Sequence, residues 1–144
     1  MILDNNALFS DQQTLLASAP STNTLDFGVN GKTAYNSVSL VTNIGMGNNI
    51  PLLIQITETV NNATSITIDV QTAAASSFAS PKNVVSLTVL LADLKAGYIL
   101  PIVALPRGIK QRYLRLNYTV TGTAPTTGKI TAGIVMDVDG AYRG

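Results

Sequence analysis

The stretch that decides the fold reads Arg112-Tyr113-Leu114-Arg115-Leu116-Asn117-Tyr118-Thr119-Val120-Thr121. Successive side chains of a β-strand point to opposite faces of the sheet. One face of this stretch is therefore apolar, and the other carries arginine, tyrosine and hydrogen-bonding groups. The apolar face consists of Leu114, Leu116, Tyr118 and Val120. The alternation predicts a long strand that buries one face in a core and leaves a polar face on its back.

Other segments show a strand pattern, with glycine, asparagine or proline between them. The predicted strands are residues 37–42, 50–59, 65–72, 84–89 and 129–138. Residues 91–97 predict a single helical turn closed by glycine, and no segment has the apolar spacing of a helix of ordinary length. The sequence therefore predicts an all-β fold, a two-sheet antiparallel β-sandwich of jelly-roll type with about eight strands.

The composition limits the function. Charged residues make up 12 % of the chain and the net charge is +1, so no long-range field steers nucleic acid or anionic membranes. Histidine and cysteine are both absent, which removes the side chains most used for acid–base catalysis near neutral pH, nucleophile activation and zinc binding. We expect a protein that is not an enzyme, has no cofactor or metal, and binds neither nucleic acid nor membrane.

Length and hydropathy predict how the chain is organised. With 144 residues, it is expected to form one jelly-roll domain, 1–144, with a short N-terminal arm at about residues 1–13. Its first residues have no basic start and no apolar run, so they do not predict a secretory signal. The most apolar stretch, residues 98–105, is far shorter than the roughly 20 residues that cross a bilayer. We expect a soluble protein made in a cytoplasm.

Two patterns suggest chemistry and are better explained by structure. Gly45-Met46-Gly47 resembles part of a phosphate-binding loop, but no Lys-Ser/Thr follows it and the next segment predicts a strand, so a tight turn is favoured. A pair of carboxylates could serve a glycosidase on a jelly-roll scaffold. The chain has no tryptophan and few aromatic residues, however, which argues against a sugar-binding cleft.

The polar face of the opening stretch is the first candidate contact surface. Arg112, Tyr113 and Arg115 lie on or next to it. In one interpretation they form a polar outer face, and the arginines are satisfied by carbonyls or carboxylates of neighbouring strands. In the other they form a protein interface, because arginine and tyrosine are enriched among anchoring residues. The sequence leaves both interpretations open.

Two further segments could contact a partner. Leu8 and Phe9 either pack on their own domain or reach a neighbouring subunit. Tyr98 and Ile99 begin an apolar segment in which Pro101 removes a donor from the ladder, which predicts an edge strand or an irregular segment. Because an apolar edge is usually covered, we include Tyr98 and Ile99 among the candidate interface residues.

The order and spacing of several short motifs resemble a known family. The motifs are Leu8-Phe9-Ser10-Asp11, Gly45-Met46-Gly47, Val70-Gln71-Thr72 with Phe78, Ala96-Gly97, Arg112-Tyr113-Leu114-Arg115-Leu116 with Tyr118 and Gly122-Thr123, and Gly128-Lys129-Ile130-Thr131-Ala132-Gly133. Over most of its length the chain resembles the jelly-roll capsid cement proteins of tailed bacteriophages, of the type found in a Bordetella podophage. It departs from that pattern at Ala73-Ala74-Ala75, where polar or acidic residues are expected.

The resemblance implies a structural, non-enzymatic protein of the virion. Such capsid cement, or decoration, proteins lie on the outer surface of the mature head and bridge subunits of the major capsid protein. The implied partners are the major capsid protein and the chain itself, as a homo-oligomer, either a dimer or a trimer. The alternative is a carbohydrate-binding β-sandwich module of a phage tail or fibre, which an aromatic-lined groove would favour.

Overall fold

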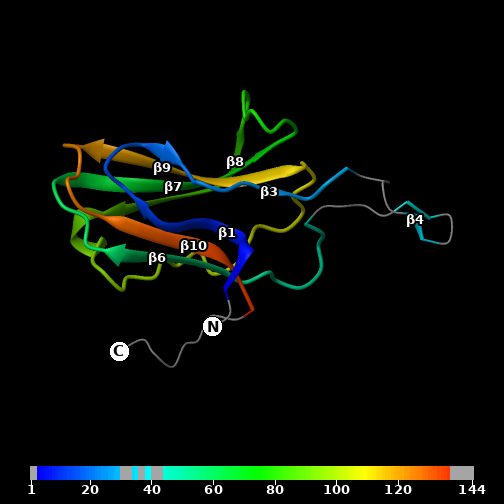
Figure 1. Ribbon diagram of the computed structural model, residues 1–144, viewed down its shortest axis with the longest axis horizontal. Helices are drawn as coiled ribbons and strands as arrows, with labels where there is room; N and C mark the ends of the chain where they lie inside the picture. The colour runs from blue at the N-terminus through cyan, green and yellow to red at the C-terminus, as the bar shows by residue number, and fades with distance from the viewer. Residues whose placement is uncertain (1–2, 30–33, 36–37, 40–43, 137–144) are drawn as a thin grey trace.

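The computed structural model describes residues 3–29, 34–35, 38–39 and 44–136. Two antiparallel sheets face each other and together hold eight strands (Figure 1). The first sheet has the order β1 (Leu3–Thr14), β10 (Lys129–Val135) and β6 (Leu52–Glu58). The second sheet has the order β2 (Ala19–Pro20), β9 (Tyr113–Gly122), β7 (Ala63–Ala73) and β8 (Lys82–Leu90), and β3 (Leu25–Asp26) also pairs with β9.

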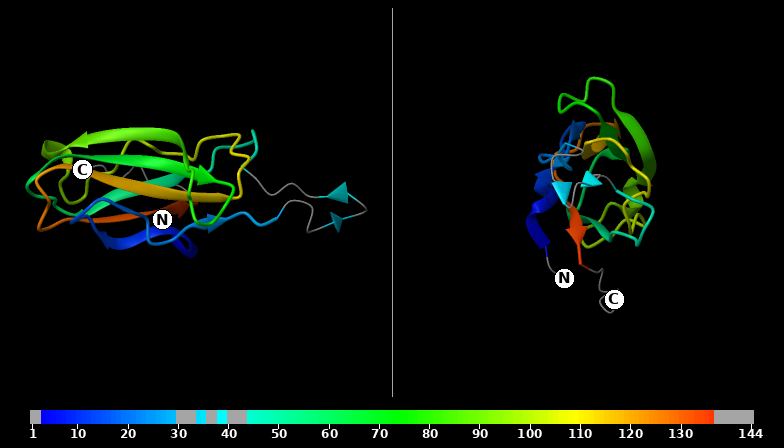
Figure 2. Two further views of the ribbon diagram at one scale, coloured as in Figure 1. Left: turned by 90° about the horizontal axis from the view of Figure 1, so that it is seen from above. Right: turned by 90° about the vertical axis from the view of Figure 1, so that its right-hand side faces the viewer.

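The remaining elements are short. The turn η1 (Leu91–Asp93) directly follows β8. Two short strands, β4 (Ala34–Tyr35) and β5 (Val38–Ser39), pair with each other in a separate two-stranded sheet. Figures 1 and 2 show this small sheet beyond one end of the sandwich.

The chain follows the path of a jelly roll. The first strand, β1, lies beside the last, β10, whereas β2 and β3 lie beside β9, the last strand but one. The chain therefore passes repeatedly between the two sheets and wraps the early strands around the later ones, as two nested Greek keys do. The predicted fold class, a two-sheet β-sandwich of jelly-roll type, is confirmed.

β9 lies inside the second sheet and shows the predicted alternation. Its inward side chains are Leu114, Leu116 and Tyr118, all fully buried, followed by the half-buried Val120. The strand pairs with β7 along its whole length, and the inward side chains of both strands enter the same core. A slip of one residue would turn Arg115 into that core. The apolar face therefore fixes where every polar side chain of β9 lies.

The other predicted strands are found with shifted ends. Residues 50–59 contain β6, residues 65–72 lie within β7, and residues 84–89 lie within β8. Residues 129–138 contain β10, with residues 137–138 outside the described residues. Of residues 37–42, the described pair 38–39 forms β5. The predicted helical turn at 91–97 is the 3-10 turn η1, and Gly97 follows with φ of +91°.

The N-terminal segment differs from the prediction. Residues 3–13, expected as part of an arm, fall within β1 (Leu3–Thr14), which pairs with β10. Phe9 is fully buried in the core. Leu8 packs over Gly133, where an added Cβ would lie 2.7 Å from Leu8 Cδ2. Because β1 shifts register against β10 three times, its bulges disrupt the regular alternation by which a strand is recognised in a sequence.

On the side away from β10, the edge of β6 is covered by residues 97–105. This segment is apolar and irregular, as predicted. The backbone N–H of Ile56 donates to the Tyr98 carbonyl at 2.9 Å, and that of Leu52 donates to the Val103 carbonyl at 3.0 Å. Between these bonds lies Pro101, which has no N–H to donate. The segment therefore satisfies the edge of β6 without forming a regular strand.

Tyr118 connects the two sheets through its hydroxyl. The side chain is fully buried, and its hydroxyl lies 2.8 Å from Ser10 Oγ on β1. Ser10 Oγ also donates to Gln13 Oε1 at 2.7 Å, so Tyr118 must donate to Ser10, whose single proton is already used. The orientation of the Gln13 amide is fixed because its Nε2 donates to the Pro20 carbonyl at 2.8 Å. Burial raises the pKa of the Tyr118 hydroxyl above its ordinary value, which keeps the donated proton in place.

Substitution of either partner of this bond should lower the free energy of unfolding, and by different amounts. Ser10→Ala leaves the buried Tyr118 hydroxyl without an acceptor and should lower the free energy of unfolding by about 1–3 kcal/mol. Tyr118→Phe removes the hydroxyl itself, so that no buried donor is left unpaired, and should lower it by about 1 kcal/mol. In urea unfolding the double variant should lose less than the sum of the two single losses. Strictly additive losses would show that the bond does not couple the sheets.

Candidate functional site

The polar side chains of β9 lie on the outer face of the second sheet, beside those of β7 and β8. The register places Arg115 opposite Gln71, and Gln71 opposite Asn83 of β8. Further along the same face, the hydroxyls of Thr67 and Thr88 lie 2.9 Å apart. This outer face is therefore built from mostly uncharged polar side chains that hydrogen-bond to one another across strands.

Arg115 is fixed by two neighbours on this face. Its Nε donates to Gln71 Oε1 at 3.0 Å, and Gln71 Nε2 donates to Asn83 Oδ1 at 3.0 Å. The guanidinium also lies over the ring of Phe78, with Cζ 4.1 Å from the ring centroid. Burial lowers the pKa of Arg115, and a guanidinium stays charged in proteins nevertheless. Arg115 thus finds a carbonyl partner on a neighbouring strand, as the first interpretation of the polar face expects.

Arg112 forms a two-pronged ion pair with Asp26 at the end of β3. Its Nε lies 2.6 Å from Asp26 Oδ1, and its Nη2 lies 2.7 Å from Oδ2. The guanidinium lies over the ring of Tyr113, 4.8 Å from the centroid. The hydrogen bond from Arg112, with a second from the Gly28 N–H, lowers the pKa of Asp26 to about 2. Both partners of the ion pair are close to two-fifths exposed, so this pair remains accessible at the surface.

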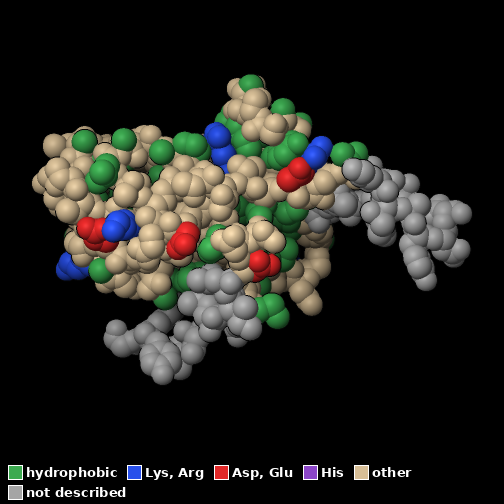
Figure 3. Space-filling model, in the orientation of Figure 1, with side chains coloured by type: hydrophobic (Ala, Val, Ile, Leu, Met, Phe, Trp, Pro, Cys, Tyr) green, Lys and Arg blue, Asp and Glu red, His purple; other side chains and the backbone are tan. Residues whose placement is uncertain are grey.

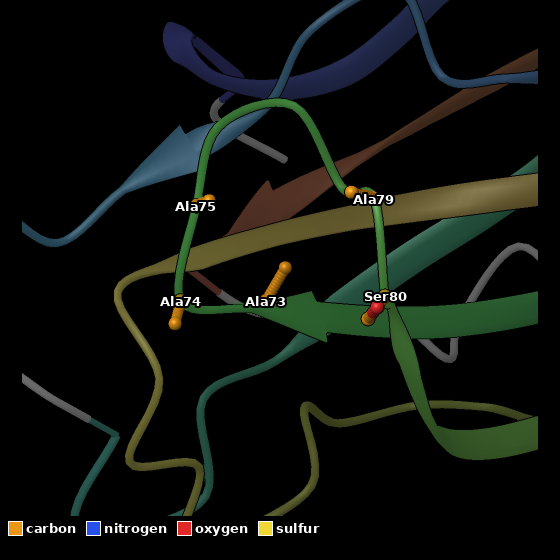
Figure 4. A pocket seen from close by; sticks show the side chains of 5 residues that line it. All are labelled: Ala73, Ala74, Ala75, Ala79 and Ser80. Carbon is orange, nitrogen blue, oxygen red and sulfur yellow. The ribbon is translucent and has the colours of Figure 1, made fainter.

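The loop between β7 and β8 encloses a small apolar hollow (Figure 4). Its volume is about 220 Å³, and it is lined by Ala73, Ala74, Ala75, Ala79 and Ser80. Figure 4 shows Ala75 and Ala79 on opposite limbs of the loop. The lining consists mainly of methyl groups, so the hollow offers a contact of small area and no charged group.

The candidate residues predicted from the sequence lie in three separate places. Arg112, Tyr113 and Arg115 belong to β9 or directly precede it, in the second sheet. The half-buried Tyr98 and Ile99 lie beside β6, at the edge of the first sheet. The third place is β1, where Leu8 and Phe9 are buried within their own domain. Of the two alternatives for Leu8 and Phe9, the structure therefore shows packing on their own chain.

The described surface carries few charges. Figure 3 shows charged side chains scattered singly or in pairs over one face of the molecule. Within residues 3–29, 34–35, 38–39 and 44–136, no group of three potential metal-ligating side chains is found. No helix in the described part of the chain is long and apolar enough to cross a membrane. The groups that the described surface presents include amides, hydroxyls, a few apolar side chains and scattered charges, of which Arg112 and Lys129 form ion pairs. Such groups can bind another surface by contact and hydrogen bonding.

Comparison with known protein families gives one match. The model of a family named Bbp16 matches residues 9–134, which is most of the chain. The chain belongs to the Bbp16 family. The family name suggests a protein of a Bordetella phage, in agreement with the expectation of a phage protein. No curated protein matches the chain.

Sequence reasoning missed the partners that hold the two arginines of this Bbp16-family protein. Asp26 lies far from Arg112 in the chain, and nothing in its local sequence marks it as the partner of Arg112. Phe78, which lies under Arg115, has φ of +49° in the loop after β7, a conformation rare for aromatic residues. The edge position of β8, which among the described residues pairs with β7 alone, was also missed, although residues 83–90 contain no charge, proline or glycine.

The Arg112–Asp26 pair predicts an acid titration that can be measured. The folded-state pKa of Asp26 is lowered from 3.8 to about 2. The pair therefore contributes stability above the ordinary pKa, and this contribution is lost as the pH falls through the folded-state value. NMR titration of the Asp26 carboxyl should give a midpoint near 2 in the wild-type protein and a midpoint closer to 3.8 in Arg112→Ala. Equal midpoints in the two proteins would contradict the ion pair.

Proposed function

We propose that this Bbp16-family protein is a capsid cement protein that binds the outer surface of the expanded phage head and bridges subunits of the major capsid protein. The observation that carries the proposal is the match to a phage family over residues 9–134. The structure adds a jelly-roll sandwich whose outer face presents fixed, mostly uncharged polar groups. Side chains held in place before binding lose little conformational freedom on contact. Such a face suits binding that must persist.

The arrangement of the accessible candidate residues supports a bridging role. Arg112 and Tyr113 are attached to the second sheet, whereas Tyr98 and Ile99 lie at the edge of the first sheet. Contacts made from both sheets allow one copy to touch two capsid subunits at once. On one surface, Arg112 forms an ion pair with Asp26 and lies over the ring of Tyr113. Arginine and tyrosine are both typical of anchoring residues at interfaces.

The proposed mechanism is physical and involves no covalent chemistry. Expansion of the head creates the sites, and a homo-oligomer of the chain then occupies several of them together. Because several contacts must release at once, dissociation becomes rare even when each contact is of modest area. A protein that binds only the assembled shell stabilises that shell against dissociation and rupture, by mass action. In this proposal the chain is not an enzyme and requires no cofactor.

The carbohydrate-binding alternative requires a groove lined by aromatic rings. Among the described aromatic side chains, Phe9, Phe78 and Tyr118 are buried. Tyr98 is partly exposed at the edge of the first sheet, and Tyr113 is partly exposed on the second. Phe27, beside Arg112, is also partly exposed but packs against the core. The described residues therefore give no specific observation that favours glycan binding over the capsid role.

Sedimentation with expanded heads that lack the protein tests the proposal. The purified wild-type chain should co-sediment with the heads and saturate at a fixed number of copies per head. Arg112→Ala should weaken binding by about tenfold or more, the effect of losing an anchoring arginine. A wild-type chain that stays in the supernatant at saturating concentration would overturn the proposal.

A matched control separates the Arg112 contact from a general effect of charge. Lys129 and Glu58 form an ion pair at 3.2 Å on the first sheet, with side chains exposed to a similar degree. Lys129→Ala removes the same charge from a similar surface pair and should leave head binding unchanged. Equal weakening by Lys129→Ala and Arg112→Ala would show that Arg112 is not a specific contact.

A further inference from the structure

The outer face of the second sheet contains a buried charge. In this sheet β9, β7 and β8 lie side by side, and among the described residues no further strand lies over their outer face (Figure 2). On this face Asp69 of β7 lies between Ser86 of β8 and Asn117 of β9. Asp69 is 8 % exposed, and of the described residues that are buried it is the only charged one. A carboxylate buried in this way needs a counter-charge or several hydrogen-bond donors.

The chain satisfies this carboxylate only in part. Ser86 Oγ donates to Asp69 Oδ1, whereas Oδ2 accepts no hydrogen bond from the described residues. The ion pairs found among the described residues, Arg112–Asp26 and Lys129–Glu58, do not include Asp69. A buried charge without an ion pair lowers the stability of the free protein. Departures of this kind from the rules of stable packing occur mainly at functional sites.

Arg115 is a second charge on this face, and it also lacks an ion pair among the described residues. Its Nε donates to Gln71 Oε1 and its guanidinium lies over the Phe78 ring, but neither Nη atom donates to a described residue. The register places Arg115 opposite Gln71, two residues from Asp69 along β7. Diagonal neighbours of this kind have Cα atoms about 7–8 Å apart. The face therefore presents an anion and a cation, each held in position by uncharged neighbours.

We propose that Asp69 and Arg115 form a docking site for an extended segment of the major capsid protein that carries one basic and one acidic side chain. The basic group binds Asp69 Oδ2, and the acidic group binds the Nη atoms of Arg115, whose planar fork suits a carboxylate. Side chains two residues apart on one face of an extended segment are about 6.6–6.8 Å apart, close to the diagonal spacing of the two charges. The site names the chemistry of the partner in the proposed function and in that respect rests on it.

The two charges select this partner over others. A segment that is uncharged, or that carries charges of one sign only, would cover at least one of the two charges without pairing it, which is strongly unfavourable. Asp69 and Arg115 are already partly removed from water and held in place in the free chain. Less free energy is therefore lost when the partner covers them.

Neutralising each charge in turn tests the site in the full chain. In sedimentation with expanded heads that lack the protein, Asp69→Asn and Arg115→Gln should each raise the Kd by about tenfold or more. Asparagine keeps an acceptor for Ser86 and removes only the charge, so the urea midpoint of Asp69→Asn should equal or exceed that of the wild type. A carboxylate that the fold requires would give the opposite result, a lower midpoint.

Asp11→Asn serves as the control, because Asp11 is exposed on β1, at the edge of the first sheet away from Tyr98 and Ile99. It makes the same chemical change and should leave the Kd unchanged. If the wild type binds heads, the docking site alone is overturned by an unchanged Kd in Asp69→Asn, by equal weakening in Asp11→Asn, or by a lower urea midpoint in Asp69→Asn. A wild-type chain that does not bind heads would overturn the proposed function and the docking site together.

Discussion

The hydrogen bond between the Tyr118 hydroxyl and Ser10 Oγ joins the two sheets at the centre of the sandwich. Tyr118 belongs to β9 in the second sheet and Ser10 belongs to β1 in the first. Both are fully buried, so an unmade bond here would leave a polar group without water or partner. Ser10 in turn donates to Gln13, whose amide binds the chain where it crosses to β2. This network thus fixes how β1, β2 and β9 lie relative to one another.

Once the inward face of β9 is fixed, its outward face has a single arrangement. Leu116 and Tyr118 cannot leave the core without carrying Arg115 into it. The same register sets Arg115 beside Gln71, and the pairing of β3 with the start of β9 brings Asp26 to Arg112. The packing of the core thereby produces a rigid and mostly uncharged outer surface. The proposed capsid role uses that rigidity, because each contact is formed by groups that are already in place.

The sequence predicted the parts of the fold that rest on regular alternation. β6, β7, β8, β9 and β10 show an apolar face with period two, which identifies them as strands. The alternation does not say which strands pair: β6 and β7 follow each other in the chain but lie in different sheets. β1 was missed because its register shifts against β10 break that period, although Phe9 is as deeply buried as the centre of β9. Arg112, Tyr113, Tyr98 and Ile99 are half-buried in the structure, and their part in an interface stays a prediction. The partners of Arg112 and Arg115 could not be predicted, since Asp26 and Phe78 reach them only through the folding of distant segments.

The central claim is that the chain binds the outside of the expanded head and bridges its subunits. Electron cryomicroscopy of expanded heads, reconstructed with and without the added protein, tests it most directly. The account predicts additional density on the outer surface between neighbouring capsid subunits, into which the two-sheet sandwich fits with one or both sheets in contact. Density inside the shell, density confined to the tail, or no difference between the two reconstructions would contradict it.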